Sequence, residues 1–204
     1  MASNSFVRRA RAVLALGLVG SAIAMAVSAA PASAGLGIAC PSATSTPFAA
    51  WQDYANYAFA PDGGFEAGAT GWSLSGGARA VSGNESFYVH SSTDKASLSL
   101  PNGASATSPP MCISLLSSKM RFLTRGDSGS SVKVQVVYRG LLSSVLGIFD
   151  GGTISSDGSW RPSPQIGMLG GVLPLLTASV SFRFTAVGGN AAIDDVYLDP
   201  MKSS

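Results

Sequence analysis

The amino-acid sequence predicts an all-β fold, an antiparallel β-sandwich or jelly roll, and three observations lead to this prediction. Apolar and polar residues alternate along 132–139 and again along 180–185. Gly-Gly pairs interrupt the chain, beginning at positions 63, 76, 151, 170 and 188. No long segment has the apolar spacing of a helix. Alternation indicates strands with one buried face, and short strands joined by Gly-rich turns favour two packed antiparallel sheets.

The first 34 residues have the order of a secretory signal peptide. Three arginines among residues 8–11 precede an apolar run over 13–30, and Ala32-Ser33-Ala34 follows. This order predicts cleavage between Ala34 and Gly35 and secretion of the mature chain. A membrane-spanning helix is the alternative, but the run is barely long enough and contains four Gly or Ser residues. The arginines leave twin-arginine export open beside the general route.

Removal of the signal peptide changes the net charge. The whole chain has 13 Lys and Arg against 11 Asp and Glu, for a net charge of +2. Three of the basic residues and none of the acidic ones lie before residue 35, so ten basic and eleven acidic residues remain, a net charge of −1. A near-neutral chain without a basic segment offers no attraction to nucleic acid. We expect no nucleic-acid partner and no membrane span after cleavage.

The mature chain suits one domain with an N-terminal arm. Cys40 and Cys112 are the only cysteines, and in an oxidising compartment such a pair most simply forms a disulfide. Closing a loop of about 73 residues would stabilise the fold by roughly 4 kcal/mol. We place the arm, tied by this disulfide, at 35–60 and the sandwich at 61–204. For residues 47–57 of the arm, a short helix and an irregular path are both open.

Short runs rich in β-branched, aromatic and leucine residues, bounded by Gly, Pro, Asn or Ser, predict the remaining strands. In chain order these runs are 87–90, 96–100, 120–124, 144–149 and 191–198.

Both ends of the sandwich region resemble carbohydrate-binding-module-like jelly rolls with a galactose-binding-type fold. Gly63-Gly64-Phe65-Glu66 and Gly71-Trp72 are similar to their opening, and Ile193-Asp194-Asp195-Val196-Tyr197-Leu198 is similar to their last strand. The resemblance spans 61–199. It implies that the first and last strands lie side by side, and that the chain is a non-catalytic module that binds a glycan or the cell envelope. The arm from Cys40 to Trp51 looks like a feature of secreted actinobacterial proteins.

The resemblance also implies a structural calcium ion. In that family, acids at the positions of Glu66, Asp194 and Asp195 help to hold calcium, which prefers several hard oxygen ligands. Adjacent strand residues point to opposite faces, so only one of the two aspartates is expected to face inward, and Asp194 is the first choice. The alternative is that these acids cap strand ends and accept bonds from backbone N–H groups.

Three tryptophans are the candidate glycan-binding residues. Sugar rings stack on flat aromatic side chains, and Trp51, Trp72 and Trp160 all lie in or beside expected loops. The apolar segment 167–176 supports a different function, that of a structural or protein-binding surface component.

A hydrolase is the third hypothesis. Gly126-Asp127-Ser128-Gly129 copies a serine-protease motif, and His90 is the only histidine of the chain. A triad also needs a base that a third group orients, and glycines with an Asp-Ser pair are what a hairpin turn uses. We therefore predict that the chain is not an enzyme and has no catalytic residue.

Overall fold

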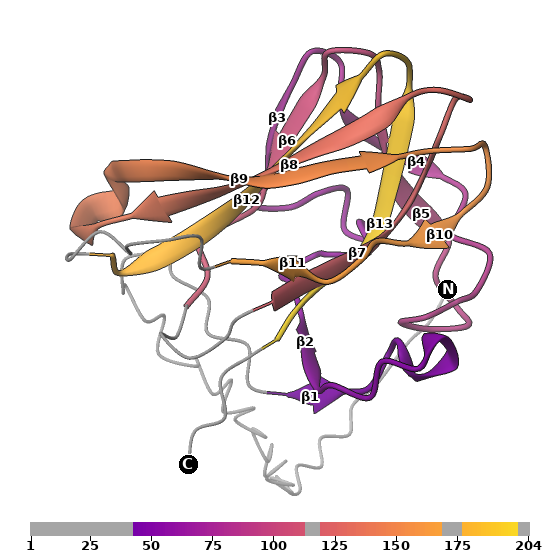
Figure 1. The fold of residues 1–204 in the computed structure, drawn as a ribbon, viewed down its shortest axis with the longest axis horizontal. Coiled ribbons are helices and arrows are strands. Elements are labelled where there is room, and N and C mark those ends of the chain that lie inside the picture. Colours follow the sequence, from indigo (N-terminus) through magenta and orange to yellow (C-terminus); the bar gives the residue numbers. More distant parts are fainter. Residues whose placement is uncertain (1–42, 113–118, 169–176, 200–204) are drawn as a thin grey trace, which may run out of the picture. The chain divides into compact units, whose positions relative to one another are not determined.

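Two antiparallel sheets pack face to face in a computed structural model that describes residues 43–112, 119–168 and 177–199 (Figure 1). The larger sheet has eight strands and the smaller one five. The helical elements of these ranges are two short 3-10 helices, η1 Ala49–Trp51 and η2 Leu141–Ser143. The predicted all-β sandwich is therefore confirmed.

The larger sheet is built around its last strand. Its members are β1 Thr44–Ser45, β2 Tyr57–Phe59, β4 Arg79–Ser82, β5 Ala96–Leu100, β7 Lys119–Gly126, β10 Arg161–Pro162, β11 Ile166–Gly167 and β13 Ala191–Leu198. Strand β13 pairs with β7 along one edge. Along its other edge it pairs first with β5, at Ala191 to Ile193, and then with β2, at Tyr197 and Leu198. On this second edge, residues 194–196 pair with no described strand. They bond instead to the turn at 60–63 and to the loop at 85–90.

The smaller sheet has the order β3-β6-β12-β8-β9. Its strands are β3 Ser73–Ser75, β6 Ser105–Thr107, β8 Ser131–Arg139, β9 Val145–Ser155 and β12 Ser179–Val187. In β8 the side chains of Val132, Val134 and Val136 are fully buried, whereas Lys133 and Gln135 are partly exposed. The alternation read from the sequence thus separates the core face from the outer face.

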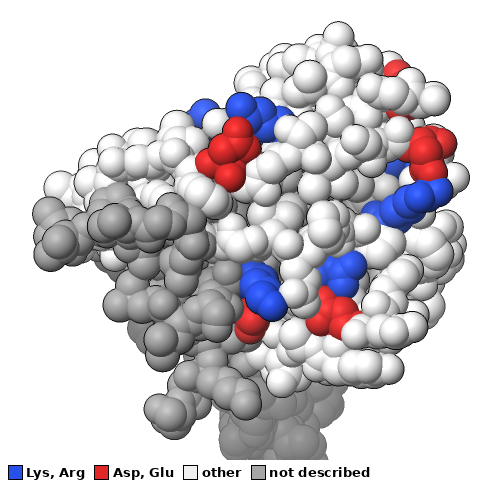
Figure 2. All heavy atoms as spheres, in the orientation of Figure 1, with Lys and Arg blue, Asp and Glu red and all other residues white. Residues whose placement is uncertain are grey.

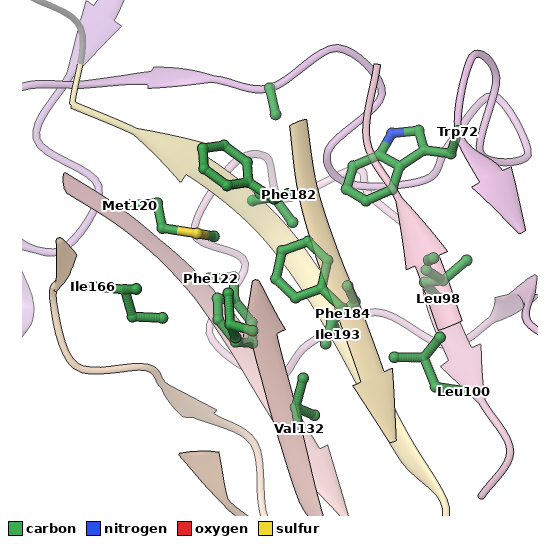
Figure 3. Packing of buried hydrophobic residues seen from close by; sticks show 14 of the residues in the cluster. Trp72, Leu98, Leu100, Met120, Phe122, Val132, Ile166, Phe182, Phe184 and Ile193 are labelled. Atoms are coloured by element: carbon green, nitrogen blue, oxygen red, sulfur yellow. The ribbon is translucent and has the colours of Figure 1, made fainter. Parts of the chain in front are cut away.

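Aromatic residues of both sheets meet in the core (Figure 3). Phe122 of β7 and Phe184 of β12 pack edge to face with their ring centroids 4.9 Å apart. Trp72 lies on the other side of Phe184, at 6.0 Å. Burial of each such ring stabilises the fold by about 1.5–3 kcal/mol, so these contacts join the two layers.

The N-terminal arm covers the outer face of the larger sheet. Phe48 packs there against Tyr57 and Tyr197, with ring centroids 5.3 Å and 5.7 Å apart. Asp53 accepts hydrogen bonds from the Tyr57 hydroxyl and from Arg121, at 2.8 Å and 2.7 Å. As a result β13 is buried on both faces along its whole length. The described part of the arm, from residue 43, therefore belongs to the sheet through β1 and β2.

Most predicted strands are confirmed. The ranges 96–100 and 191–198 match β5 and β13, and 120–124, 132–139 and 180–185 lie within β7, β8 and β12. The range 144–149 overlaps β9 except at its first residue.

Two strand predictions were wrong, and the arm holds only a short helix. Residues 87–90 form a loop. Residues 63–66 form turns, in which Phe65 has a positive φ of 61°. The expected proximity of the chain ends is nevertheless confirmed, because Val196 donates to the Gly63 carbonyl at 3.1 Å. In the arm, Gln52 takes a left-handed conformation that ends η1 after three residues.

Several predictions concern residues outside the described ranges. These are the signal peptide with its cleavage site at Ala34 and Gly35, Cys40 as the partner of Cys112, and most of the apolar segment 167–176. They stay predictions. Among the residues that the structure does describe, no helix has the length and apolar character needed to cross a bilayer.

Candidate functional site

The loop between β4 and β5 folds back onto β13, and buried carboxylates hold it there. Glu85 is almost fully buried, and its carboxylate accepts hydrogen bonds from the backbone N–H groups of Phe87 and Val89. The Glu85 N–H in turn donates to Asp194 at 3.0 Å, and the His90 N–H donates to Asp195 at 2.9 Å. Because carboxylates satisfy these N–H groups, the segment 87–90 does not need a strand partner.

A bulge in β13 turns both aspartates toward this loop. The register with β7 shifts between Asp194 and Tyr197, and Asp195 has a positive φ of 47°. The Asp195 N–H donates to the second oxygen of Asp194 at 2.9 Å. Strict alternation along β13 would send the two side chains to opposite faces, but a bulge relaxes it. Both carboxylates therefore reach the 85–90 loop.

Asp195 has one oxygen without a partner. Its side chain is fully buried, and among the described residues its Oδ1 atom has no hydrogen bond. A Cβ atom added to Gly64 would lie 3.2 Å from this oxygen and 3.8 Å from a carboxylate oxygen of Asp94. Glycine at position 64 therefore leaves room beside two carboxylates.

Three residues bring possible metal ligands together at this point. Ligand atoms of His90, Asp94 and Asp195 lie within 4.8 Å of one another. The His90 Nδ1 atom is 2.7 Å from Asp94, and its ring stacks on Phe59 with centroids 3.9 Å apart. Two close carboxylates, one with an unpartnered oxygen, suit a hard cation such as calcium.

The buried aspartates have strongly perturbed acidities. Burial, together with the negative charge of Asp195, raises the pKa of Asp194 to about 9. Burial and the charge of Glu85 raise the pKa of Asp195 to about 7, although the His90 N–H favours its ionised form. Near neutral pH the pair therefore retains protons unless a cation compensates its charge.

The predicted calcium ligands are only partly brought together. Asp195 lies in the group with His90 and Asp94, whereas both oxygens of Asp194 accept backbone N–H bonds. Glu66 is exposed, and its Oε1 atom accepts bonds from Lys95 and Ala96, both at 2.7 Å. Sequence reasoning missed Asp94 and treated His90 as an isolated residue. Their spacing of four positions within a polar turn was the available signal.

The tryptophans have different environments. Trp72 is buried in the core, and its indole N–H donates to the Pro61 carbonyl at 2.9 Å. Trp160 is buried below the guanidinium group of Arg125, which lies 5.1 Å from its ring centroid. Neither offers a free ring face. Trp51 is half-buried and is the one of the three that reaches an exposed aromatic group.

Trp51 and two exposed residues of the loop, Phe87 and Tyr88, form what we call the aromatic surface. The Phe87 ring packs edge to face on Trp51 with centroids 5.0 Å apart, and it is 47% exposed. Tyr88 is 51% exposed and has a left-handed backbone with φ of 53°. A bulky residue rarely takes this conformation without a compensating contact, and here buried carboxylates fix the neighbouring N–H groups.

A groove adjoins the same loop. Its volume is about 520 Å³, and it lies between the arm and the loop. The lining residues are Ala43, Thr44, Ser45, Thr46, Pro47, Phe59, Val89, His90 and Tyr197. The lining combines hydroxyl groups with apolar and aromatic side chains, which are the kinds of group that orient and stack a sugar.

On the face shown in Figure 2, charged residues lie in groups of both signs rather than in a field of one sign. In Figure 2, blue and red atoms lie next to each other in small groups separated by wide uncharged areas. Lys133 is 3.3 Å from Asp150, and Arg161 contacts Asp157. In its described part, this face carries no extended positive surface.

The serine-protease-like tetrapeptide serves as a turn. Residues 126–129 connect β7 with β8, where the Ser130 N–H donates to the Asp127 carbonyl at 2.9 Å and Gly129 has a φ of 85°. The Asp127 carboxylate accepts bonds from the backbone and side-chain amides of Asn190, at 2.9 Å and 3.0 Å. The hydrogen bonds of Asp127 are thus those of a turn residue.

Comparison with known proteins gives structural similarity only. Neither a protein-family model nor a curated protein matches the chain. Among solved structures, the chain is similar to the TmCBM61 module in complex with β-1,4-galactotriose, with 20% identity and a TM-score of 0.50, over 70% of this chain and 98% of that one. It is also similar to the enzymatically active domain of tailspike protein 4 of bacteriophage CBA120, with 12% identity and a TM-score of 0.51.

The tailspike match covers 69% of this chain and 21% of that one. A third similar structure is the CBM22-1 xylan-binding domain of Paenibacillus barcinonensis Xyn10C, with 13% identity and a TM-score of 0.47 over 69% of this chain and 93% of that one. The structural neighbours thus include carbohydrate-binding modules with a jelly-roll fold. Because one fold carries many functions, the similarity fixes the fold and leaves the function to the site.

Proposed function

We propose that the chain is a secreted, non-catalytic module that binds a glycan, such as one of the cell envelope, through the aromatic surface. The observation that carries this proposal is the exposure of Phe87 and Tyr88 on a loop held by buried carboxylates. Aromatic rings in water cost solvation free energy and contribute little to the fold, so their exposure favours a binding role. Sugars stack on such rings through their apolar faces.

The fixed loop supports binding in a second way. A glycan that meets rings already in position loses no free energy to ordering them. Here Glu85 fixes the loop from inside through the N–H groups of Phe87 and Val89. The adjoining groove adds the hydroxyl groups of Thr44, Ser45 and Thr46, which supply hydrogen bonds to a sugar.

A structural calcium ion at Asp195 and Asp94 is part of the proposal. The unpartnered Asp195 oxygen and the space beside Gly64 support it. A divalent cation there would compensate the negative charge under the loop and hold the aromatic surface in place. The role of the ion would be structural, because its ligands lie under the loop.

The binding test uses the protein recovered from the culture medium after export. We expect it to bind at least one polysaccharide of a glycan array, and Phe87→Ala to weaken that binding about tenfold through loss of a stacked ring. Tyr54→Ala is the matched control, because among the described residues Tyr54 is the most exposed aromatic residue and makes no ring contact. Isothermal titration measures each affinity.

Two results would contradict the proposed site. One is equal weakening by Phe87→Ala and Tyr54→Ala. The other is the absence of any glycan that the wild-type protein retains.

Calcium is tested separately by thermal unfolding. Calcium at a hundred times its dissociation constant should raise the melting temperature by about 5–10 °C relative to the protein in chelator. Asp195→Asn should abolish this shift. Asp150→Asn, which removes an exposed acid of β9, should leave it intact. A shift that survives Asp195→Asn would place the ion elsewhere.

A further inference from the structure

The hairpin between β8 and β9 ends in an exposed apolar group. We call Leu141, Leu142, Val145, Leu146 and Ile148 the apolar tip. Leu142 is 83% exposed, Leu141 68% and Val145 55%. In Figure 1 this hairpin extends beyond the layered part of the sandwich, at the end opposite to the arrowhead of β9. The side chains therefore lie at a projecting end of the described structure.

The apolar tip has no charge of its own. No ionisable residue occurs from 140 to 149, and the flanking charged residues are Arg139 and Asp150. Exposed hairpin ends of soluble proteins normally carry polar turn residues. A hollow of about 430 Å³ beside the tip also has the apolar side chains of Leu141, Leu146 and Ala178 among its walls.

Local hydrogen bonds fix the shape of the tip. The Gly140 N–H donates to the Ser144 carbonyl at 2.8 Å, and the Ser144 hydroxyl donates to the Leu141 carbonyl at 3.2 Å. Arg139 donates from its guanidinium group to the Ser143 carbonyl at 3.2 Å and to the Ser181 hydroxyl at 2.8 Å. The two leucines are thus presented in a defined geometry.

The backbone conformation of Leu142 is unfavourable for a leucine and lowers the stability of the fold. Its φ of 60° and ψ of 25° place a leucine in the left-handed region, which disfavours side chains of this size. Its exposure means that no core contact compensates for this strain. An exposed apolar side chain in a strained conformation points to a function outside the folded chain itself.

We propose that the apolar tip inserts into the interfacial layer of a lipid bilayer that contains anionic headgroups. A projecting, uncharged end with several leucines suits a bilayer, whose acyl boundary accepts apolar side chains of any outline. The positive charge of Arg139, which precedes the tip, favours anionic lipid, because Asp150 on the other flank is paired with Lys133 at 3.3 Å. The Arg139 guanidinium group has five N–H donors, and the two bonds described above leave others for a headgroup phosphate.

Binding at the apolar tip is independent of glycan binding. The tip belongs to the smaller sheet, whereas the aromatic surface lies on the arm and the loop after β4. A module that holds both a glycan and a membrane surface would be retained at a cell envelope. Failure of either proposal leaves the other standing, since vesicles without sugar test the tip alone.

The test is co-sedimentation of the exported protein with vesicles. We expect binding to vesicles of phosphatidylcholine and phosphatidylglycerol, and weaker binding to phosphatidylcholine alone. The double variant Leu141→Ser with Leu142→Asn should lower the partition coefficient at least about tenfold, since two leucines no longer insert. Asparagine tolerates the left-handed backbone, so the variant should fold. Val187→Ser is the control. Val187 is an exposed apolar residue at the end of β12 that is far from the tip, where it pairs with Ser131 rather than with Arg139.

A second measurement locates the contact. Leu142→Trp should show a blue-shifted emission with the mixed vesicles and none with buffer alone. The proposal is overturned if the wild-type protein stays in the supernatant, if the double variant and Val187→Ser sediment equally, or if the emission does not shift. An elution volume that shows a dimer in the wild type and a monomer in the double variant would also overturn it, in favour of self-association.

Discussion

The loop that carries the aromatic surface and the hairpin that carries the apolar tip both expose apolar side chains, but different contacts hold them in place. Each places apolar side chains in solvent, and each contains a bulky residue with a left-handed backbone, Tyr88 at φ 53° and Leu142 at φ 60°. The loop is held by the buried carboxylates of Glu85, Asp194 and Asp195. The tip is held by a backbone turn and one arginine.

This difference decides what each region responds to. A loop fixed by buried carboxylates depends on their ionisation, and hence on pH and on cations. The hairpin contains no ionisable group from 140 to 149, so its shape should be insensitive to both. We therefore expect the conformation of the aromatic surface to depend on pH and on cations, and that of the apolar tip to depend on neither.

The largest expected effect comes from removal of the carboxylate inside the loop. Glu85→Ala deprives two backbone N–H groups, those of Phe87 and Val89, of a charged acceptor. Two such bonds in a buried place are worth about 3 kcal/mol, so the free energy of unfolding should fall by about this amount. Urea unfolding followed by circular dichroism measures it.

Glu66→Ala is the matched control for this change. Glu66 also accepts two backbone N–H bonds, but it is exposed, so water replaces its carboxylate. The loss should stay below about 1 kcal/mol. Similar losses from the two variants would show that burial of Glu85 is not what fixes the loop.

The next effect is the dependence of stability on pH in chelator. Asp194 and Asp195 have folded pKa values of about 9 and about 7, both above the ordinary value of 3.8. The folded state therefore holds more protons than the unfolded state as pH rises from about 4, and stability falls by about 1.4 kcal/mol per pH unit for each extra proton. Their contribution is complete below pH 4 and is lost as pH rises through the folded pKa values.

We expect a loss on the order of 2 kcal/mol between about pH 5 and pH 8, after discounting for local relaxation. Asp195→Asn should flatten this profile, because an amide does not titrate, and Asp150→Asn should not. Excess calcium should reverse the slope, since a cation favours the ionised pair. A wild-type profile that rises with pH in chelator would contradict the burial of these carboxylates as protonated groups.

The two regions also show what sequence reasoning reaches. Period-two alternation predicted β8 and β12 because their side chains alternate between the core and solvent. The segment 191–198 was predicted as the last strand and its proximity to residues 63–66 was also predicted, whereas its pairing with β2, β5 and β7 was not. The segment 87–90 has the same apolar composition as a strand, and it was predicted wrongly as one. Its N–H groups bond to carboxylates instead of a neighbouring strand: those of Phe87 and Val89 bond to Glu85, and that of His90 bonds to Asp195, 105 positions away. A strand pattern does not encode such contacts.

The candidate site was predictable only in part for the same reason. Asp195 followed from a motif, whereas Asp94 and His90 join it through a bulge that a strand pattern does not reveal. Among the tryptophans, sequence reasoning identified the residue type suited to sugar stacking but not its burial. Burial separates Trp51 from Trp72 and Trp160: Trp72 packs in the core between the sheets, and Trp160 packs in the cluster on the outer face of the larger sheet. Phe87 and Tyr88 were missed as binding residues because they lay within the segment 87–90, which was predicted as a strand.

The smallest expected effect tests whether the apolar tip contributes to the fold at all. Leu142→Asn replaces an 83% exposed side chain, so little packing is lost, and asparagine suits the left-handed backbone better than leucine. The free energy of unfolding should therefore rise by about 0.5–1 kcal/mol. Leu141→Asn is the control, since Leu141 is exposed without a positive φ, and it should give no gain. A loss of stability from Leu142→Asn would mean that the leucine packs within the chain, and the tip would then be a structural feature rather than a surface kept for a membrane.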